Sequence, residues 1–173
     1  MARSLKRQAA MLPWVLLALF ISSCSSVGAN EEKTVRNRSQ FSRGWGQNIR
    51  WLKDYNAGLD ALKKTHKPLM VIHHLDGCPH SQALKKAFVA DKAIQKMAKE
   101  SFVMLNVVEE TGDPNLAPDG HYVPRILFID PTLTVRTEIT GKHSGNLYTY
   151  TPDDMELLAE NMKKAKTLLH NEL

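Results

Sequence analysis

The chain has 173 residues, of which 43% are hydrophobic and 24% charged, a composition that suits one globular domain with targeting segments. Its formal net charge is +5, but Arg3, Lys6 and Arg7 lie in the first 29 positions, and beyond them 20 basic residues stand against 18 acidic ones. The remaining surplus of +2 is too small to indicate a nucleic-acid partner.

The first 29 residues have the three parts of a secretory signal peptide. A basic stretch, 1–11, precedes an apolar run, 12–21, and small residues follow as far as Ala29. The apolar run is shorter than the roughly 20 residues that a membrane-spanning helix needs, so we predict cleavage before Asn30 and no membrane insertion. A buried core helix and a bacterial lipoprotein signal ending at Cys24 are the alternatives.

The last four residues, His170-Asn171-Glu172-Leu173, resemble the Lys-Asp-Glu-Leu type of retrieval address that a receptor reads in the early secretory pathway. Together with a signal peptide, this tail predicts residence in the lumen of the endoplasmic reticulum and binding to the retrieval receptor. The first two residues of the tail depart from the strictest form of the address. We therefore also expect partial secretion to the extracellular space.

The chain contains two cysteines. Cys24 lies in the segment that we expect to be removed, so Cys78 is the only thiol of the predicted mature protein. No intramolecular disulfide is then possible. A lone cysteine in an oxidising compartment is buried, paired with another molecule, or used chemically.

Residues 30–43 are polar and lack apolar periodicity, which predicts a flexible N-terminal arm. Within it, Asn37-Arg38-Ser39 has the spacing of an N-glycosylation acceptor, with Asn37 as the modified residue. We expect the ordered domain to span residues 44–169, between this arm and the tail at 170–173.

Apolar patterning and turn residues predict the elements of this domain. Helical spacing places three helices at 51–62, from Cys78 to about Lys99, and from Thr151 to Leu169. Short apolar runs place four strands at 69–72, 102–108, 125–130 and 134–139. A helical crossover makes the first two strands parallel, and the fourth should pair antiparallel with the third. This order predicts an α/β, thioredoxin-like fold with a central mixed β-sheet flanked by α-helices.

Cys78 opens a helix directly after a strand and a polar loop, in the motif Cys78-Pro79-His80-Ser81. Unpaired backbone N–H groups and the helix dipole favour the thiolate at this position, so we interpret Cys78 as a reactive thiol rather than an inert buried one. His80 adds positive charge when it is protonated. Ser81 stands where a resolving cysteine would be, and its hydroxyl cannot displace sulfur. Autonomous dithiol oxidation or reduction is therefore excluded, whereas capture, isomerisation and covalent dimerisation remain.

Pro124 comes just before the third predicted strand, where a thioredoxin-like fold places a cis proline beside the active cysteine. On this interpretation the Val123 backbone pairs with an extended client segment. The alternative is an ordinary proline that begins a strand.

Four metal-capable residues, His73, His74, Cys78 and His80, lie within eight positions. A zinc site needs four converging ligands, and the chain offers no second ligand pair with familiar spacing, so we predict neither a metal nor a cofactor. We expect His73 and His74 to be loop residues at the end of a strand, one pointing inward and the other outward.

Several stretches resemble the vertebrate anterior gradient proteins, which belong to the protein disulfide isomerase superfamily. The resemblance covers residues 42–173 and is carried by the segments 42–46, 67–70, 72–76, 78–86, 118–120, 122–125 and 133–136, among which Cys-Pro-His-Ser is the most specific. It implies Cys78 as the redox-active residue, a retrieval tail and a homodimer. The chain departs from the family pattern at Gly77 and in the segment 55–59, where the family has acidic residues.

The resemblance also implies a role in folding cysteine-rich secreted clients such as mucins, and a developmental role in anterior ectoderm, cement gland or regeneration. The sequence thus supports a single-cysteine protein that captures or isomerises client disulfides, an enzyme of protein disulfide isomerase type at most. The alternative is a secreted signalling ligand for a cell-surface receptor, in which the thiol is incidental.

Overall fold

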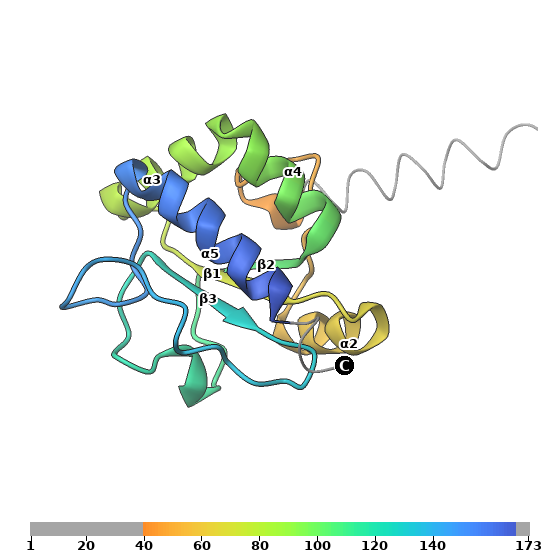
Figure 1. Cartoon of the computed structure of the whole chain (residues 1–173). Coiled ribbons are helices and arrows are strands. Elements are labelled where there is room, and N and C mark those ends of the chain that lie inside the picture. The colour runs from red at the N-terminus through yellow and green to blue at the C-terminus, as the bar shows by residue number, and fades with distance from the viewer. Residues whose placement is uncertain (1–39, 169–173) are drawn as a thin grey trace, which may run out of the picture. The chain divides into compact units, whose positions relative to one another are not determined.

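A mixed sheet of three short strands forms the centre of the domain in a computed structural model that describes residues 40–168. The middle strand, β1 (Leu69–His73), pairs in parallel with β2 (Val103–Val107) and antiparallel with β3 (Arg125–Ile129) (Figure 1). The parallel pairing of the first two strands confirms the predicted crossover. All residues of β1 and β3 are buried, because helices and loops cover both faces of the sheet.

Helices lie on the two faces, and the alternation of side chains along β1 separates two apolar clusters. The four main helices are α2 (Tyr55–Thr65), α3 (Pro79–Ala90), α4 (Lys92–Ser101) and α5 (Met155–Thr167). Met70 and Ile72 point to the side of α3, α4 and α5. Leu69 and Val71 point to the opposite side, where Leu62 of α2 packs. The helices on the two faces form the outer layers of the predicted thioredoxin-like fold, and the strands β1 to β3 form the layer between them.

The long helix that the sequence predicts from Cys78 to about Lys99 is instead two helices that meet at Asp91. The backbone of Asp91 is extended, with φ −81° and ψ 104°, and its carboxylate accepts the N–H groups of Ala93 and Ile94. Asp91 is therefore the N-cap of α4 and ends α3. The prediction was wrong because a capping aspartate can restart a helix without any glycine or proline.

The first predicted helix also begins later than expected. Asp54 caps α2 by accepting the N–H of Ala57 at 2.9 Å. Trp51 lies before this cap, in an isolated bridge with Met104, and its indole N–H donates to the carbonyl of Gly46 at 2.8 Å.

The fourth predicted strand, 134–139, is reduced to a single bridge between Ile129 and Val135. The carboxylate of Asp130 accepts the backbone N–H groups of Thr132 and Thr134 and so holds a tight turn directly after β3. Further turns within residues 135–139 curl the chain before a ladder can form. In place of a strand ladder, the Arg136 N–H donates to the carbonyl of Phe128 in β3 at 2.8 Å, and the Thr134 carbonyl accepts the N–H of Asp130 at 3.0 Å.

The start of α5 agrees with its predicted signal. A short 3₁₀ turn, η2 (Pro152–Asp154), leads into the helix, and Thr151 and Asp154 form a reciprocal capping box. Another 3₁₀ turn, η1 (Pro114–Leu116), lies within the loop between β2 and β3. None of the helices in residues 40–168 is long and apolar enough to cross a membrane.

The folded unit begins before the predicted boundary at residue 44. Ser42 is buried, and the side-chain amide of Asn106 donates to the carbonyls of Phe41 and Ser42. The end of the predicted arm, 40–43, thus packs on β2. The predicted signal peptide with Cys24, the acceptor Asn37 and the retrieval tail lie outside the described residues.

Candidate functional site: a single thiol at a helix N-terminus

Cys78 is the N-cap residue of α3, with Pro79 in the first turn of the helix. Its N–H donates to the carbonyl of Leu75 at 3.1 Å, and its carbonyl accepts the N–H of Gln82 at 3.0 Å, which fixes the backbone on both sides. The side chain is partly exposed. The thiol is therefore held in place yet open to a partner.

The backbone N–H groups of the first helical turn favour the ionised form of this thiol. Sγ makes no capping hydrogen bond of ordinary geometry, but the Ser81 backbone N–H has the largest effect and lowers the pKa of Cys78. The Ser81 hydroxyl and the His80 backbone N–H lower that pKa further, while partial burial opposes them. Cys78 therefore has more thiolate at neutral pH than a free cysteine.

Ser81 is almost fully buried, with 1% of its surface exposed. Its hydroxyl oxygen accepts the N–H of Leu75 at 3.4 Å, so it also steadies the loop that carries the thiol. The residue in the resolving position thus supports the site and influences Cys78, but offers no second sulfur.

The Val123–Pro124 peptide bond is cis, as the sequence predicts from topology. The thiol of Cys78 lies 3.9 Å from the carbonyl oxygen of Val123. The Pro124 carbonyl accepts the hydroxyl of Thr149 at 2.9 Å, which ties this segment to the loop before α5. Two predicted site elements, 45 residues apart in the chain, are therefore in contact.

A pocket of about 250 Å³ adjoins this contact. His80 and Ala83 of α3 form one wall and Val123 and Pro124 another, and the remaining lining residues are Asn146, Thr149, Tyr150, Thr151 and Pro152. His80 is exposed, and within residues 40–168 no hydrogen bond joins its ring to Sγ. The structure therefore places His80 at the pocket beside the thiol, rather than on the thiol itself.

Comparison with known proteins agrees with this geometry. Residues 50–131 match the protein family described as thioredoxin-like. The chain is 52% identical to anterior gradient protein 3 of Xenopus tropicalis over 161 residues, which cover 93% of this chain and 98% of that protein. It is 52% identical to human anterior gradient protein 3, covering 91% and 94% of the two chains. Identity to the human anterior gradient protein 2 homolog is 59%, covering 77% and 75%.

The chain belongs to the anterior gradient family. Its match to the thioredoxin-like family confirms the fold that the sequence predicts.

In this anterior gradient protein, both His73 and His74 are buried, with 2% and 1% of their surfaces exposed, so the prediction that one points outward was wrong. His73 is the last residue of β1, and burial, followed by the nearby Arg125 charge, lowers its pKa to about 3. His74 lies against the ring of Trp45, and its Nε2 is 3.4 Å from Oδ1 of Asn106. Packing of the segment 41–45 over the strand end buries the second histidine.

An ion pair that was not predicted from the sequence lies beside His73. Arg125 is fully buried, and its guanidinium donates to Glu110 Oε2 and to the carbonyls of Leu116 and Tyr122. Burial opposes ionisation of Glu110, but the Arg125 contact outweighs it and lowers the pKa of that carboxyl. A basic residue at the start of a buried strand is the one signal that indicates a buried partner.

In residues 40–168, no three metal-capable side chains converge.

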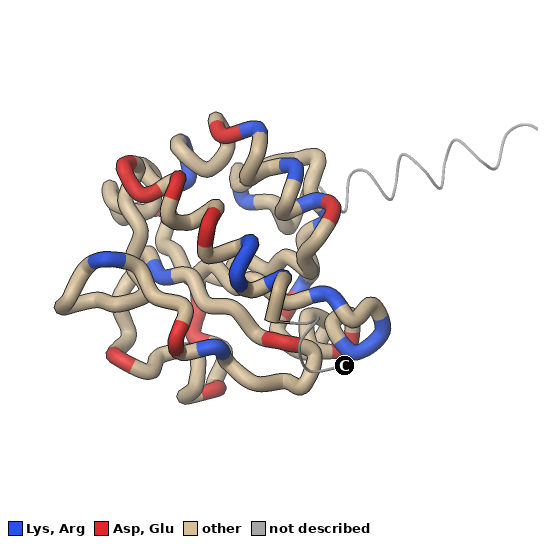
Figure 2. Tube along the Cα trace, viewed as in Figure 1, with Lys and Arg blue, Asp and Glu red and all other residues tan. Residues whose placement is uncertain are grey.

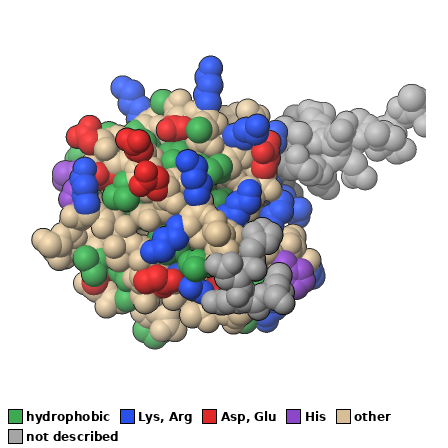
Figure 3. All heavy atoms as spheres, viewed as in Figure 1, with side chains coloured by type: hydrophobic (Ala, Val, Ile, Leu, Met, Phe, Trp, Pro, Cys, Tyr) green, Lys and Arg blue, Asp and Glu red, His purple; other side chains and the backbone are tan. Residues whose placement is uncertain are grey.

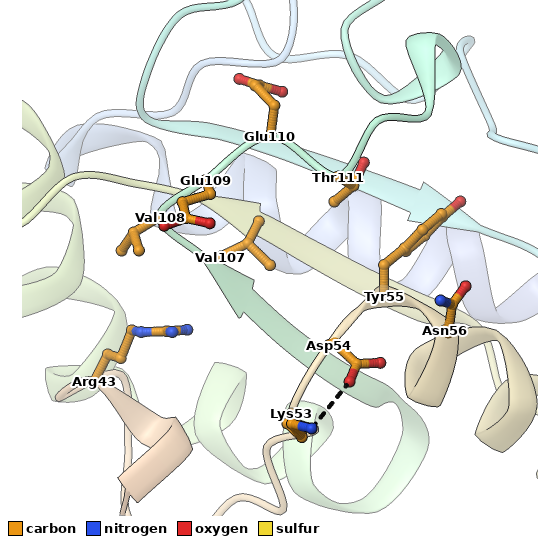
Figure 4. Close-up of a pocket in the computed structure, with 10 residues that line it drawn as sticks. All are labelled: Arg43, Lys53, Asp54, Tyr55, Asn56, Val107, Val108, Glu109, Glu110 and Thr111. Atoms are coloured by element: carbon orange, nitrogen blue, oxygen red, sulfur yellow. Dashed lines mark ion pairs between the residues drawn. The ribbon is translucent and has the colours of Figure 1, made fainter.

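A larger pocket, of about 350 Å³, lies where β2 ends and α2 begins (Figure 4). Tyr55 and Asn56 line it from α2, residues 107–111 from the end of β2, and Arg43 from the N-terminal segment. Its lining includes positively and negatively charged side chains. Two of them, Lys53 and Asp54, form an ion pair in which Nζ and Oδ2 are 3.9 Å apart. None of its lining residues is a cysteine.

Proposed function

We propose that this protein captures the cysteines of client proteins as mixed disulfides on Cys78. The observation that carries the proposal is the contact of the Cys78 thiol with the Val123 carbonyl, at 3.9 Å. This thiol is partly exposed, and the backbone N–H of Ser81 lowers its pKa. An inert structural cysteine would be buried among apolar side chains and would have a raised pKa.

The chemical step is thiol–disulfide exchange. The Cys78 thiolate attacks one sulfur of a client disulfide, the client S–S bond breaks, and a Cys78–client S–S bond forms. The other client sulfur leaves as a thiolate and takes a proton from water. One disulfide is consumed and one is formed, so no external oxidant or reductant is needed.

Release of the client needs a thiol that does not come from the active-site motif. Ser81 is buried, and its hydroxyl is too weak a nucleophile to expel the client. A thiolate of the client itself completes an isomerisation by attacking the mixed disulfide, which returns Cys78 to its thiolate. This route fits an isomerase-like or retention role rather than net oxidation.

The Val123 backbone and the adjoining pocket are the proposed binding surface for the client. An extended client segment lies along Val123, its cysteine at Cys78, and a neighbouring side chain enters the pocket beside His80. The pocket lining combines apolar side chains, two of them prolines, with hydroxyls, an amide and an imidazole, so it offers a client side chain both apolar contact and hydrogen bonds.

We further propose the lumen of the endoplasmic reticulum as the place of action, with partial secretion, cysteine-rich mucin-like proteins as clients and the retrieval receptor as a second partner. The signal-like N-terminus and the tail at 170–173 support the location. Membership of the anterior gradient family supports the client class, a homodimer, and a developmental role in anterior ectoderm, cement gland or regeneration.

The proposal is tested by trapping adducts from cells that secrete a cysteine-rich protein. Cells expressing the full chain are quenched with acid, alkylated, and analysed on non-reducing gels. We expect adducts with the wild type, none with Cys78→Ser, and fewer with Ser81→Cys, which restores a resolving thiol in the same buried position. Absence of wild-type adducts, or a single species at twice the mass, would contradict client capture; the latter would assign Cys78 to a covalent homodimer.

A further inference from the structure

Exposed lysines gather at the end of the molecule opposite the thiol. Three helices finish there, and six exposed lysines lie on their last two turns or just after them: Lys63, Lys64, Lys67, Lys99, Lys163 and Lys166. Lys164 of α5 is also exposed but donates to the carbonyl of Glu138 at 3.2 Å, and it is left out of this set. We call this set the lysine pole. Figure 2 shows basic residues at the ends of α2 and α4 and along the second half of α5, and Figure 3 shows their side chains over this part of the surface.

Contacts within the domain place these helix ends together. Lys67 follows α2, and its ammonium donates to the carbonyl of Glu100, near the end of α4, at 2.7 Å. Leu168, after α5, packs into the same apolar cluster as Phe102, which follows α4. The pole also lies where β1 and β2 begin, whereas Cys78 comes after the end of β1. A ligand on the pole therefore leaves the thiol free.

The charges of the pole are not neutralised within the domain. In the described part of the chain, no carboxylate forms an ion pair with any of the six lysines. In residues 40–168, the nearest acids in sequence are Asp60, Glu100 and Glu160, all exposed. Lysines in the last turn of a helix are stabilised by the negative end of the helix dipole. Lys67 lies beyond the end of α2, so its charge is not explained by the dipole of that helix.

We propose that the lysine pole binds a sulfated linear polysaccharide. The pole offers only flexible ammonium groups: all large exposed apolar side chains of residues 40–168, Leu75, Val89, Leu133 and Leu147, lie outside α2, α4 and α5. Protein interfaces are depleted in lysine and centred on apolar or aromatic anchors, so a folded protein partner is disfavoured. Clustered basic residues without stacking aromatics suit a flexible polyanion, and sulfated glycans are the polyanions of the extracellular space that we propose the protein reaches.

The test measures binding of a heparin-derived decasaccharide to the full mature chain across a range of salt concentrations. The pole variant Lys64→Gln/Lys99→Gln/Lys166→Gln removes one charge from each helix end. The control variant Lys53→Gln/Lys86→Gln/Lys92→Gln removes the same charge elsewhere, including the other end of α4. Circular dichroism and thermal unfolding check that both variants fold.

We expect the pole variant to bind about tenfold to a hundredfold more weakly at physiological salt, on the basis of the contribution of single lysines at anionic surfaces. The slope of log affinity against log salt should fall by about 2 to 3. The control variant should lose less than about threefold. Equal losses in both variants, or no wild-type binding, would overturn the proposal. So would equal affinity for polyglutamate of the same charge or stronger binding to phosphatidylserine vesicles, which would point to an acidic protein or a membrane.

Discussion

The carboxylate of Asp119 accepts the backbone N–H of Leu147 at 2.6 Å, which joins two loops that lie 28 residues apart. The Tyr122 hydroxyl donates to the same carboxylate at 2.8 Å and accepts the N–H of Tyr148 at 3.0 Å. This arrangement fastens the loop before α5 to the segment that carries Val123. Both loops line the pocket beside Cys78, so the contact supports the geometry of the site from outside it.

Replacing Tyr122 by phenylalanine should loosen this fastening. Loss of the hydroxyl leaves the Tyr148 N–H without its acceptor, and we expect the free energy of unfolding to fall by about 1 to 2 kcal/mol. Amide exchange at Tyr148 should be faster, and the rate of client capture should fall. Tyr148→Phe is the control, because its hydroxyl donates to the Thr137 carbonyl, away from the pocket. Equal capture rates in the two variants would show that the fastening does not position the site.

The ionisation of Cys78 can be followed through its rate of alkylation by iodoacetamide as the pH is raised. Because the helix N–H groups lower the pKa of this thiol, the midpoint should lie below that of a free cysteine, about 8.5. Ser81→Ala removes the hydroxyl and keeps the backbone N–H, so it should raise the midpoint only partly. A wild-type midpoint at or above that of free cysteine would contradict the assignment.

The lowered pKa of Cys78 also makes the stability of the fold depend on pH. A cysteine whose pKa is lower in the folded state stabilises the fold as a thiolate. Its contribution is absent below the folded pKa, grows as the pH rises through it, and is complete above the pKa of the unfolded chain. Urea unfolding of the wild type relative to Cys78→Ser should show this rise.

How far the sequence predicts this molecule depends on whether a feature is local. Cys78 at a helix start and the cap at Thr151 follow from neighbouring residues, and both were predicted. The cis peptide before Pro124 was predicted from topology, because the fold requires a proline beside the cysteine. The burial of His74 follows from contact with Trp45, 29 positions away in the chain, and no local pattern indicates it.

Two of the missed features share one physical cause, which is the ability of a single aspartate to redirect the backbone. Asp91 restarts a helix, and Asp130 turns the chain before a fourth strand can pair. In each case an aspartate carboxylate accepts two backbone N–H groups, a local choice that apolar periodicity does not report. The pair Arg125 and Glu110 was missed for a different reason, since it depends on how the loop after β2 returns to β3.

His73 should make the fold less stable in mild acid. Its folded pKa is about 3, whereas a histidine in the unfolded chain has a pKa of about 6.5, so between these values only the unfolded chain takes up the proton. Stability should therefore fall as the pH drops below about 6.5, by about 1.4 kcal/mol per pH unit for this residue. His74, whose pKa is also lowered by burial, acts in the same direction.

Unfolding of the wild type and of His73→Gln between pH 7 and 5 measures the contribution of His73. The free energy of unfolding should change less steeply with pH in the variant, because the variant takes up about one proton fewer on unfolding. Nuclear magnetic resonance of the His73 ring gives an independent check. A ring that titrates near pH 6.5 in the folded protein would contradict the burial of a neutral His73.

Asp154 is the buried centre of the cap that begins α5. Its Oδ2 accepts the N–H and the hydroxyl of Thr151, each at 2.7 Å, and lies 2.9 Å from His143 Nε2. Lys142 is 2.6 Å from its other oxygen. Burial works against ionisation, but these contacts hold the pKa of Asp154 well below its usual range. The carboxylate thus joins the loop that lines the pocket to the start of the last helix.

Asp154→Asn should destabilise the domain by about 2 to 4 kcal/mol at pH 7, because a neutral amide cannot replace a buried acceptor of several donors. The carboxylate stabilises fully above its unfolded pKa of about 3.9, and this contribution is lost as the pH falls toward the folded value. The difference between wild type and variant in urea unfolding should therefore shrink between pH 4 and 2. The exposed neighbour provides a matched control, since Asp153→Asn makes the same chemical change and should alter stability by less than about 0.5 kcal/mol. Similar losses in both variants would show that general charge near the helix start, rather than the buried cap, stabilises this end of α5.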